Sequence, residues 1–226
     1  IEIEDTIRAP GSQLSLDACA ETGDPLFCGW VNRSPSGSLW TGTAGWMTAS
    51  LANLGETHFE GIDFEGDYAM TLGEGSLSIN ALATYMLTKE STPFPAVPET
   101  KYDCVGVIDS STCFATPEWR GTVQAVYSLD SWTLGAKMRI FGKVDYRGAT
   151  DLIAQDELGS IQSYMDVFGS YTFLEDDNAT LRFGVNNILD EEPPLVGGTL
   201  SSNGNQIAGF YDTLGRFMYG KLTYRL

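Results

Sequence analysis

Three carboxylates, Asp63, Glu65 and Asp67, alternate with other residues in one segment of the chain. Because side chains of a strand point alternately to its two faces, an extended segment would place all three on one face. Carboxylate pairs act as acid and base in glycoside hydrolases, and carboxylate clusters bind Ca²⁺. Three interpretations are therefore open: an acid-catalysed hydrolase, a Ca²⁺ site, and a row of charges in contact with water, which the sequence favours.

Other catalytic signatures are missing from the sequence. His58 is the only histidine, and there is no Gly-x-Ser-x-Gly elbow, phosphate-binding loop or dinucleotide fingerprint. A zinc site is disfavoured because no Cys-x-x-Cys occurs. A net charge of −17 and a pI near 4.2 make nucleic acid a poor partner. We therefore expect no enzyme, no cofactor and no nucleic-acid partner.

The four cysteines, Cys19, Cys28, Cys104 and Cys113, form two pairs of equal spacing. Local bridges within each pair are the simplest of three possible connectivities, and they require an oxidising compartment. Closing such short loops contributes roughly 2–3 kcal/mol. Four free thiols in a cytosolic core remain the alternative, although the surrounding sequence is polar and rich in Gly, Pro and Asp.

Apolar and polar side chains alternate with a period of two in seven segments. Such segments suit either a half-buried soluble sheet or a membrane barrel with one face in lipid and the other in water. Lengths of about ten residues or more favour a tilted membrane crossing, since soluble strands average about five or six. The last segment reaches the chain end, which is typical of a strand that closes a sheet. The segments are 62–72, 77–87, 119–129, 132–143, 164–173, 179–186 and 217–226.

The connections between these segments alternate between two lengths. Short turns are expected at 73–75, 130–131 and 175–178, whereas the other connections are long. Outer-membrane barrels have short periplasmic turns and long extracellular loops, whereas long structureless loops are uncommon in soluble domains. If residues 1–6 form a further strand, the long loops are 7–55, 90–116, 146–159 and 191–209.

Several short motifs in the sequence resemble motifs of one protein family. Gly184-Val-Asn-Asn-Ile-Leu-Asp190 precedes Glu191-Glu-Pro-Pro194, and Tyr211-Asp-x-Leu-Gly-Arg216 leads into the last segment. Thr57-x-x-x-Gly-Ile-Asp-Phe64 and Pro117-Glu-Trp-Arg120 are similar to two recurrent strand starts of that family. In their order and spacing, these motifs resemble the C-terminal part of TonB-dependent outer-membrane receptors. Leu226 departs from the Phe with which the family usually ends.

The resemblance implies an all-β fold, a transmembrane antiparallel β-barrel. Family barrels have about twenty-two strands and a plugged lumen. Residues 1–226 would be the C-terminal portion of the barrel, roughly its last eight strands, with the four long loops extracellular and the plug domain absent. A complete barrel of about eight strands is the rival architecture.

The resemblance also implies a function. The chain would form the wall and outer vestibule of a receptor in the bacterial outer membrane that takes up a scarce nutrient, such as a siderophore, cobalamin or a saccharide. Its partners would be outer-membrane lipid, the small-molecule nutrient, the remainder of the receptor with its plug domain, and TonB through the missing N-terminal part.

Two groups of residues are candidates for the transport path. Basic side chains on the wettable strand faces would face the lumen, where pairing with plug carboxylates or solvation is the simplest role; they are Arg120, Lys137, Arg139, Arg182, Lys221 and Arg225. Aromatic side chains in the loops could stack on a ligand or pack the loops together; they are Trp30, Trp40, Trp46, Tyr102, Phe114, Tyr146 and Phe210.

Two other classes of protein remain open. A secreted soluble β-sandwich that binds carbohydrate would bury Ile79, Ala81, Val123 and Leu134 in a core. A hydrolase would place residues 63–67 in a cleft with one carboxyl of raised pKa.

Overall fold

The computed structural model describes most of the chain, in two compact units. One unit comprises Ile1–Glu60 with Thr88–Asp103, and the other Gly61–Leu87 with Cys104–Leu226. None of the helices in the described part of the chain combines the length and apolarity that crossing a bilayer requires. The described residues are 1–8, 11–39, 45–48, 50–93, 101–109, 113–147, 158–173, 178–197 and 205–225.

One large sheet contains most of the strands, and neighbours in the sheet follow one another along the chain. Its order is β1-β4-β5-β8-β9-β11-β12-β13, with the short β6 (Tyr102–Asp103) paired to β5. The predicted all-β antiparallel architecture is confirmed, although no pairing among the described residues joins β13 to β1, so the sheet is open. The strands are β1 (Glu2–Arg8), β4 (Ala52–Leu72), β5 (Gly75–Thr92), β8 (Trp119–Leu129), β9 (Trp132–Phe141), β11 (Gln162–Phe173), β12 (Ala179–Asn186) and β13 (Phe217–Tyr224).

The predicted bounds of the first long loop, 7–55, are wrong at both ends. Strand β1 continues to Arg8 and β4 starts at Ala52, because Arg8 pairs with Ala52 and Ile7 with Asn53. Register shifts interrupt this pairing, so the strand lacks the simple alternation by which the sequence could have revealed it. The connection also contains secondary structure: α1 (Ser12–Thr22), α2 (Pro25–Gly29), β2 (Val31–Asn32) and β3 (Trp46–Met47).

The second and third long connections also contain short strands. Strand β5 runs three residues into the predicted loop 90–116, as far as Thr92. Strand β7 (Val107–Ile108) pairs in parallel with β10 (Asp145–Tyr146), which begins one residue before the predicted loop 146–159. Pairing between the two loops organises this end of the second unit, which a search for period-two segments cannot detect.

Strand register gives the sheet two chemically distinct faces. One row across β5, β8, β9, β11, β12 and β13 is apolar throughout: Ile79, Ala125, Ala136, Val167, Val185 and Met218. A row on the opposite side is polar throughout: Ser76, Ser128, Thr133, Ser170, Arg182 and Lys221. We call the sides that carry these rows the apolar face and the polar face. The predicted alternation in these six strands is therefore in phase across the sheet.

The hydrophobic cores lie in the connections and not on the apolar face. In the second unit a loop core comprises Ile108, Val144, Tyr146, Leu158, Val196 and Tyr211. In the first unit Ala18, Phe27 and Trp30 form a small core on the two helices. By contrast, Val123 and Leu134 on the apolar face are 43% and 49% exposed. No described segment covers these two side chains.

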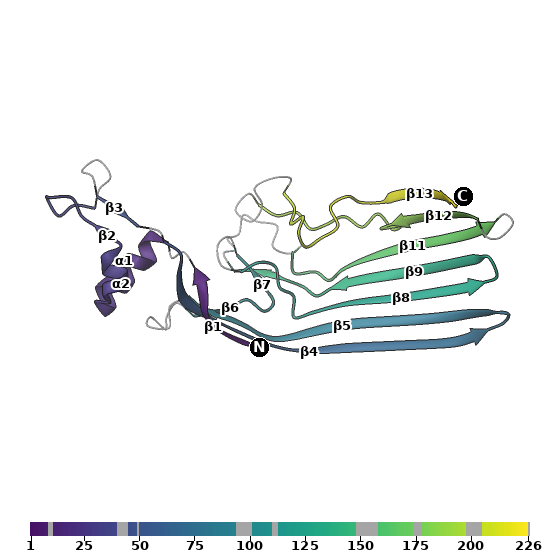
Figure 1. Cartoon of the computed structure of the whole chain (residues 1–226), viewed down its shortest axis with the longest axis horizontal. Coiled ribbons are helices and arrows are strands. Elements are labelled where there is room, and N and C mark those ends of the chain that lie inside the picture. The colour runs from purple at the N-terminus through teal and green to yellow at the C-terminus, as the bar shows by residue number, and fades with distance from the viewer. Residues whose placement is uncertain are drawn as a thin grey trace. The chain divides into compact units, whose positions relative to one another are not determined.

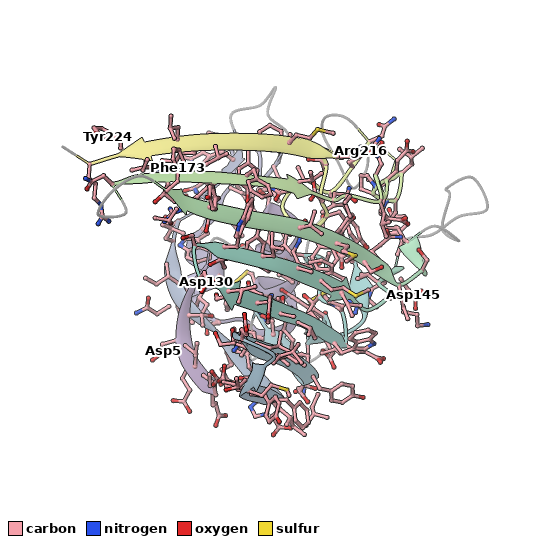
Figure 2. All side chains as sticks on the ribbon, turned by 90° about the vertical axis from the view of Figure 1, so that its right-hand side faces the viewer. Asp5, Asp130, Asp145, Phe173, Arg216 and Tyr224 are labelled. Carbon is pink, nitrogen blue, oxygen red and sulfur yellow. A yellow bond between two sulfur atoms is a disulfide. The ribbon has the colours of Figure 1, made fainter. Side chains whose placement is uncertain are left out.

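The strand ends of the second unit fall into two groups. Asp130, Phe173 and Tyr224 lie at one end of the strands, and Asp145 and Arg216 lie at the opposite end (Figure 2). Strands β8, β9, β11, β12 and β13 run side by side between these ends (Figure 1). The short turn at Asp130 lies at the first end, whereas Asp145, after β9, and Arg216, before β13, belong to long connections and lie at the second, as predicted from the lengths of these connections.

Both predicted disulfides are present. Cys19 is bonded to Cys28 and Cys104 to Cys113, and no described cysteine is free. The first bridge ties the end of α1 to α2, and the second closes the loop that contains β7.

Removing the first bridge is expected to destabilise its unit. In the variant Cys19→Ser/Cys28→Ser the free energy of unfolding should fall by about 2–3 kcal/mol, because the unfolded loop gains conformational entropy. Urea unfolding followed by tryptophan fluorescence measures the change. A reducing agent should destabilise the parent and leave the variant less affected; equal stability of variant and parent would contradict the prediction.

Candidate functional site

The predicted carboxylates lie on the polar face and contact polar side chains of the next strand. Thr84 Oγ1 donates to Asp63 Oδ1 at 2.7 Å, and Asn80 Nδ2 donates to Asp67 Oδ1 at 2.7 Å. These bonds align β4 with β5, so Glu65 lies opposite Leu82. In the described ranges, no group of three or more His, Cys, Asp and Glu residues could hold a metal ion.

A groove of about 520 Å³ crosses the polar face at this point. Carboxylates of β4 line one side, Arg120 and Arg139 line the other together with Thr122 and Phe141, and Leu82 and Thr84 of β5 lie between the two sides. Register places Thr84 opposite Arg120 and Leu82 opposite Thr122, and β9 continues the same rows with Phe141 and Arg139. The groove therefore has side chains of opposite charge on its two sides.

Arg139 also anchors a charged network across three parts of the chain. Its Nη2 donates to Asp166 Oδ1 at 3.1 Å and to Asp212 Oδ2 at 2.8 Å. The backbone N–H of Asn187 donates to the same oxygen of Asp166 at 2.9 Å. The Arg139 side chain is 25% exposed and each Asp side chain 13%. These bonds attach the last long connection, through Asp212, to the wall formed by β9 and β11.

Aromatic side chains surround this network. The Arg139 guanidinium lies 5.2 Å from the ring centroid of Tyr164, within the range of a cation–π contact. Phe210 packs edge to face on Phe141 at 5.2 Å and on Tyr211 at 4.6 Å. The hydroxyls of Tyr164 and Tyr211 are buried without a hydrogen-bond partner among the described residues.

Burial raises the pKa of Tyr211 to about 12, and the nearby Tyr164 adds to the shift. Because the folded-state pKa lies above the ordinary value of 10.0, the neutral hydroxyl contributes stability that is present below pH 10 and lost as the pH rises through about 12. We expect the free energy of unfolding to fall over this range in the parent and to fall less in Tyr211→Phe. At pH 7 that variant should be at least as stable as the parent, since it loses no hydrogen bond to a described residue. Denaturant titrations at several pH values test both expectations, and equal pH dependence would refute the first.

The two family motifs near the C-terminus, residues 184–194 and 211–216, contact each other. Asp190 Oδ1 accepts from the backbone N–H of Arg216 at 2.8 Å, and Arg216 Nη2 donates to Asp190 Oδ2 at 3.3 Å. Asn187 exchanges two hydrogen bonds of 2.9 Å with the backbone of Glu191. Asn187, Asp190 and Gly215 all have positive φ, where Asn, Asp and Gly are the favoured residues. These hydrogen bonds and backbone conformations explain why the two motifs carry Asn, Asp, Gly and Arg at these positions.

Strand register places the predicted lumen-facing cations on one side of the sheet. Arg120 and Arg139 lie in the groove rows, Lys137 lies opposite Gln124 and Asp166, and Arg182 lies opposite Lys221. Arg225 follows β13 and donates its backbone N–H to Asn178. Of the six predicted cations, Arg139 alone forms an ion pair with a described residue. That this side faces a lumen remains a prediction.

The loop aromatics divide into buried and exposed groups. Trp30 packs against Phe27 in the core of the first unit, and Tyr146 belongs to the loop core of the second. Phe210 is half-buried against that loop core, and Tyr102 is half-buried on β6. Phe114 and Trp46 are 88% and 58% exposed. Packing explains Trp30 and Tyr146, whereas Phe114 and Trp46 are open to solvent; Trp40 lies outside the described residues.

Sequence reasoning missed Asp166, Asp212 and Tyr164 as members of a site. Asp212 follows Tyr211 in a family motif, and this position in a motif could have marked it as a site residue. Asp166 and Tyr164 appear in the sequence only as members of the polar side of a strand. Their partner Arg139 is 27 residues from Asp166 and 73 from Asp212, so spacing alone could not join them.

These features define a class of protein. An antiparallel meander with an exposed apolar face, a polar face and long connections at one end is the architecture of outer-membrane β-barrels. A family model described as TonB dependent receptor-like, beta-barrel matches residues 18–188, more than half of the chain. The chain therefore belongs to the family of TonB-dependent receptor β-barrels, as its sequence motifs indicated. No curated protein and no solved structure matches it.

Proposed function

We propose that this chain forms wall and outer vestibule of an energy-coupled receptor that takes up a scarce nutrient across the bacterial outer membrane. Proteins of the matched family are transporters and not enzymes. The observation that carries the proposal is the exposed apolar face, which extends unbroken over β5, β8, β9, β11, β12 and β13.

The exposure of this face favours lipid as its environment. Leu181 on β12 is 40% exposed, and Leu222 and Met218 on β13 are 66% and 69% exposed. Soluble monomers rarely expose apolar patches above a few hundred Å², because each Å² costs about 25 cal/mol in water. In lipid the same surface has no such cost.

The soluble β-sandwich makes a different demand on the same residues. It requires Ile79, Ala81, Val123 and Leu134 to be buried, whereas the first two are half-buried and the last two exposed. A sheet with lipid on one side accounts for all four exposures without a second layer of polypeptide.

Aromatic side chains at both ends of the apolar face support a membrane crossing. Near the short turns Trp132 stacks on Tyr171 at 4.3 Å, and Tyr171 stacks on Phe173 at 5.7 Å. Near the long connections Tyr85 lies opposite Trp119. Along β8, Trp119 and Tyr127 are about 26 Å apart at 3.3 Å per residue, which a tilt of about 40° reduces to about 20 Å in height. The apolar band of such barrels is about 25 Å tall between its aromatic girdles.

Membership of the family supplies the remaining parts of the proposal. The short-turn end is periplasmic, and the long connections, predicted as 7–55, 90–116, 146–159 and 191–209, are extracellular. The sheet supplies roughly the last eight strands of a barrel of about twenty-two. Its partners are outer-membrane lipid, the rest of the receptor with its plug domain, and TonB through the N-terminal part of the receptor; siderophores, cobalamin, saccharides and similar compounds are the candidate nutrients.

Membrane fractionation tests the proposal. We expect the chain, expressed with an export signal together with the rest of the receptor that supplies the other strands, to sediment with outer membranes, to resist carbonate extraction and to need detergent for solubility. A matched soluble periplasmic protein serves as the control. Recovery of the folded chain in the soluble fraction would overturn the proposal.

A further inference from the structure

We propose that the groove on the polar face of β4, β5, β8 and β9 is a subsite for a zwitterionic tripeptide. The inference rests on the proposed function, because it names the class of nutrient that the receptor wall would contact. It concerns residues within a single compact unit.

The two charged sides of the groove lie at a fixed separation. One row across the strands runs from Asp63 through Thr84 to Arg120, and the next runs from Glu65 through Leu82 to Thr122. Neighbouring strands are about 4.8 Å apart, so the backbones that carry the carboxylates and Arg120 are about 10 Å apart.

Both sides retain capacity to bind a ligand. Thr84 donates one hydrogen bond to Oδ1 of Asp63, which leaves the other lone pairs of that carboxylate available. Arg120 is exposed and forms no ion pair with a described residue. Arg139, at the far side of the groove, is already neutralised by Asp166 and Asp212. An anionic group would therefore be drawn mainly to Arg120, and a cationic group to Asp63 and Glu65.

An extended tripeptide fits these constraints. Three residues span about 10 Å at 3.3–3.6 Å each, which matches the distance between the two sides. Its ammonium group would meet the carboxylates of β4, and its carboxylate the guanidinium of Arg120, which holds carboxylates with two parallel hydrogen bonds. Leu82, 48% exposed, and the ring of Phe141 offer apolar contact to its side chains. A groove of about 520 Å³ lies within the usual range for small-ligand sites.

The probe is trialanine in four forms: both ends free, N-acetylated, C-amidated, and both ends capped. Binding to the full chain in detergent micelles is measured by isothermal titration calorimetry. We expect the free peptide to bind most tightly, and each cap to weaken binding by about three- to tenfold, because each removes one charge-assisted contact.

Paired variants assign each end of the peptide to one side of the groove. Arg120→Gln should abolish the preference for a free carboxylate and keep the preference for a free ammonium. The variant Asp63→Asn/Glu65→Gln should show the converse. Lys137→Gln, which removes a cation from the same face outside the groove, is the matched control and should keep both preferences. A folding defect would weaken all four peptides alike and so cannot imitate this pattern.

Several outcomes would overturn the subsite. Equal binding of the four peptide forms would do so, as would tight binding of maltotriose that ignores the variants, which would indicate a neutral saccharide site. Membrane insertion of the same preparation separates this result from the proposed function. Normal insertion without peptide binding refutes the tripeptide subsite alone, whereas failure to insert refutes the transporter.

Discussion

Replacing Met138 with Arg impairs insertion of the sheet into a bilayer by about 2–4 kcal/mol, because a guanidinium near the midplane of the lipid must be desolvated. Met138 lies on the apolar face of β9, opposite Val123 on β8 and Met165 on β11, midway between the aromatic rows of Trp119 and Tyr127, and is 41% exposed. No described residue offers a carboxylate on this side of the strand at that row. The expected result is loss of folded protein from liposomes, measured by urea titration in the presence of lipid vesicles.

Thr133→Arg is the matched control for this prediction. Thr133 lies on the same strand and points to the polar face, opposite Ser128 and Ser170. A guanidinium there remains hydrated if this side faces water, so insertion should change by less than about 1 kcal/mol. Normal assembly of Met138→Arg, or equal damage from the two variants, would show that the apolar face does not contact lipid.

Replacing Arg139 with Gln is expected to lower the free energy of unfolding by about 2–4 kcal/mol. The change leaves Asp166 and Asp212, both largely buried, without the guanidinium that joins them. The connection that carries Asp212 would then lose its bond to the wall of β9 and β11. Denaturant unfolding in micelles measures the loss, and faster proteolysis of residues 205–216 should accompany it.

A neutral version of the network distinguishes charge from packing. In the triple variant Arg139→Gln/Asp166→Asn/Asp212→Asn no unpaired charge remains, and most of the lost stability should return. If the triple variant is as unstable as Arg139→Gln alone, the network stabilises the chain through the shape and contacts of the arginine side chain. If Arg139→Gln has the stability of the parent, the network contributes nothing measurable.

The period-two alternation predicted most strands and their faces correctly because it reflects a local property of the backbone. Successive side chains of a strand alternate wherever the strand lies, so residues 119–129 and 132–143 revealed β8 and, with an overrun of two residues, β9 without knowledge of their neighbours. The method failed where alternation is absent. It ended the first strand too early, because the register shifts in β1, and it missed β7 and β10, which have two residues each.

The candidate site was predicted less completely than the fold. The polar side of each strand, including Asp63, Arg120 and Arg139, followed from the sequence. The sequence did not predict which of these residues lie in the same row across the sheet, because register depends on the pairing of strands that are distant in the chain. The loop aromatics show the same limit. Trp30 and Phe114 look alike in the sequence, yet one is buried against Phe27 and the other is 88% exposed.

The sequence by itself determined a meander of antiparallel strands with one apolar and one polar face, two local disulfides, and the family to which the chain belongs. These features depend on the spacing of residues close together in the chain and on motifs of a few residues. Only the tertiary structure decided that no described segment covers the apolar face, that Arg139 joins Asp166 to Asp212, and that the carboxylates of β4 and the guanidinium of Arg120 line opposite sides of one groove. Each of these depends on contacts between residues far apart in the chain, which alternation along one strand cannot specify.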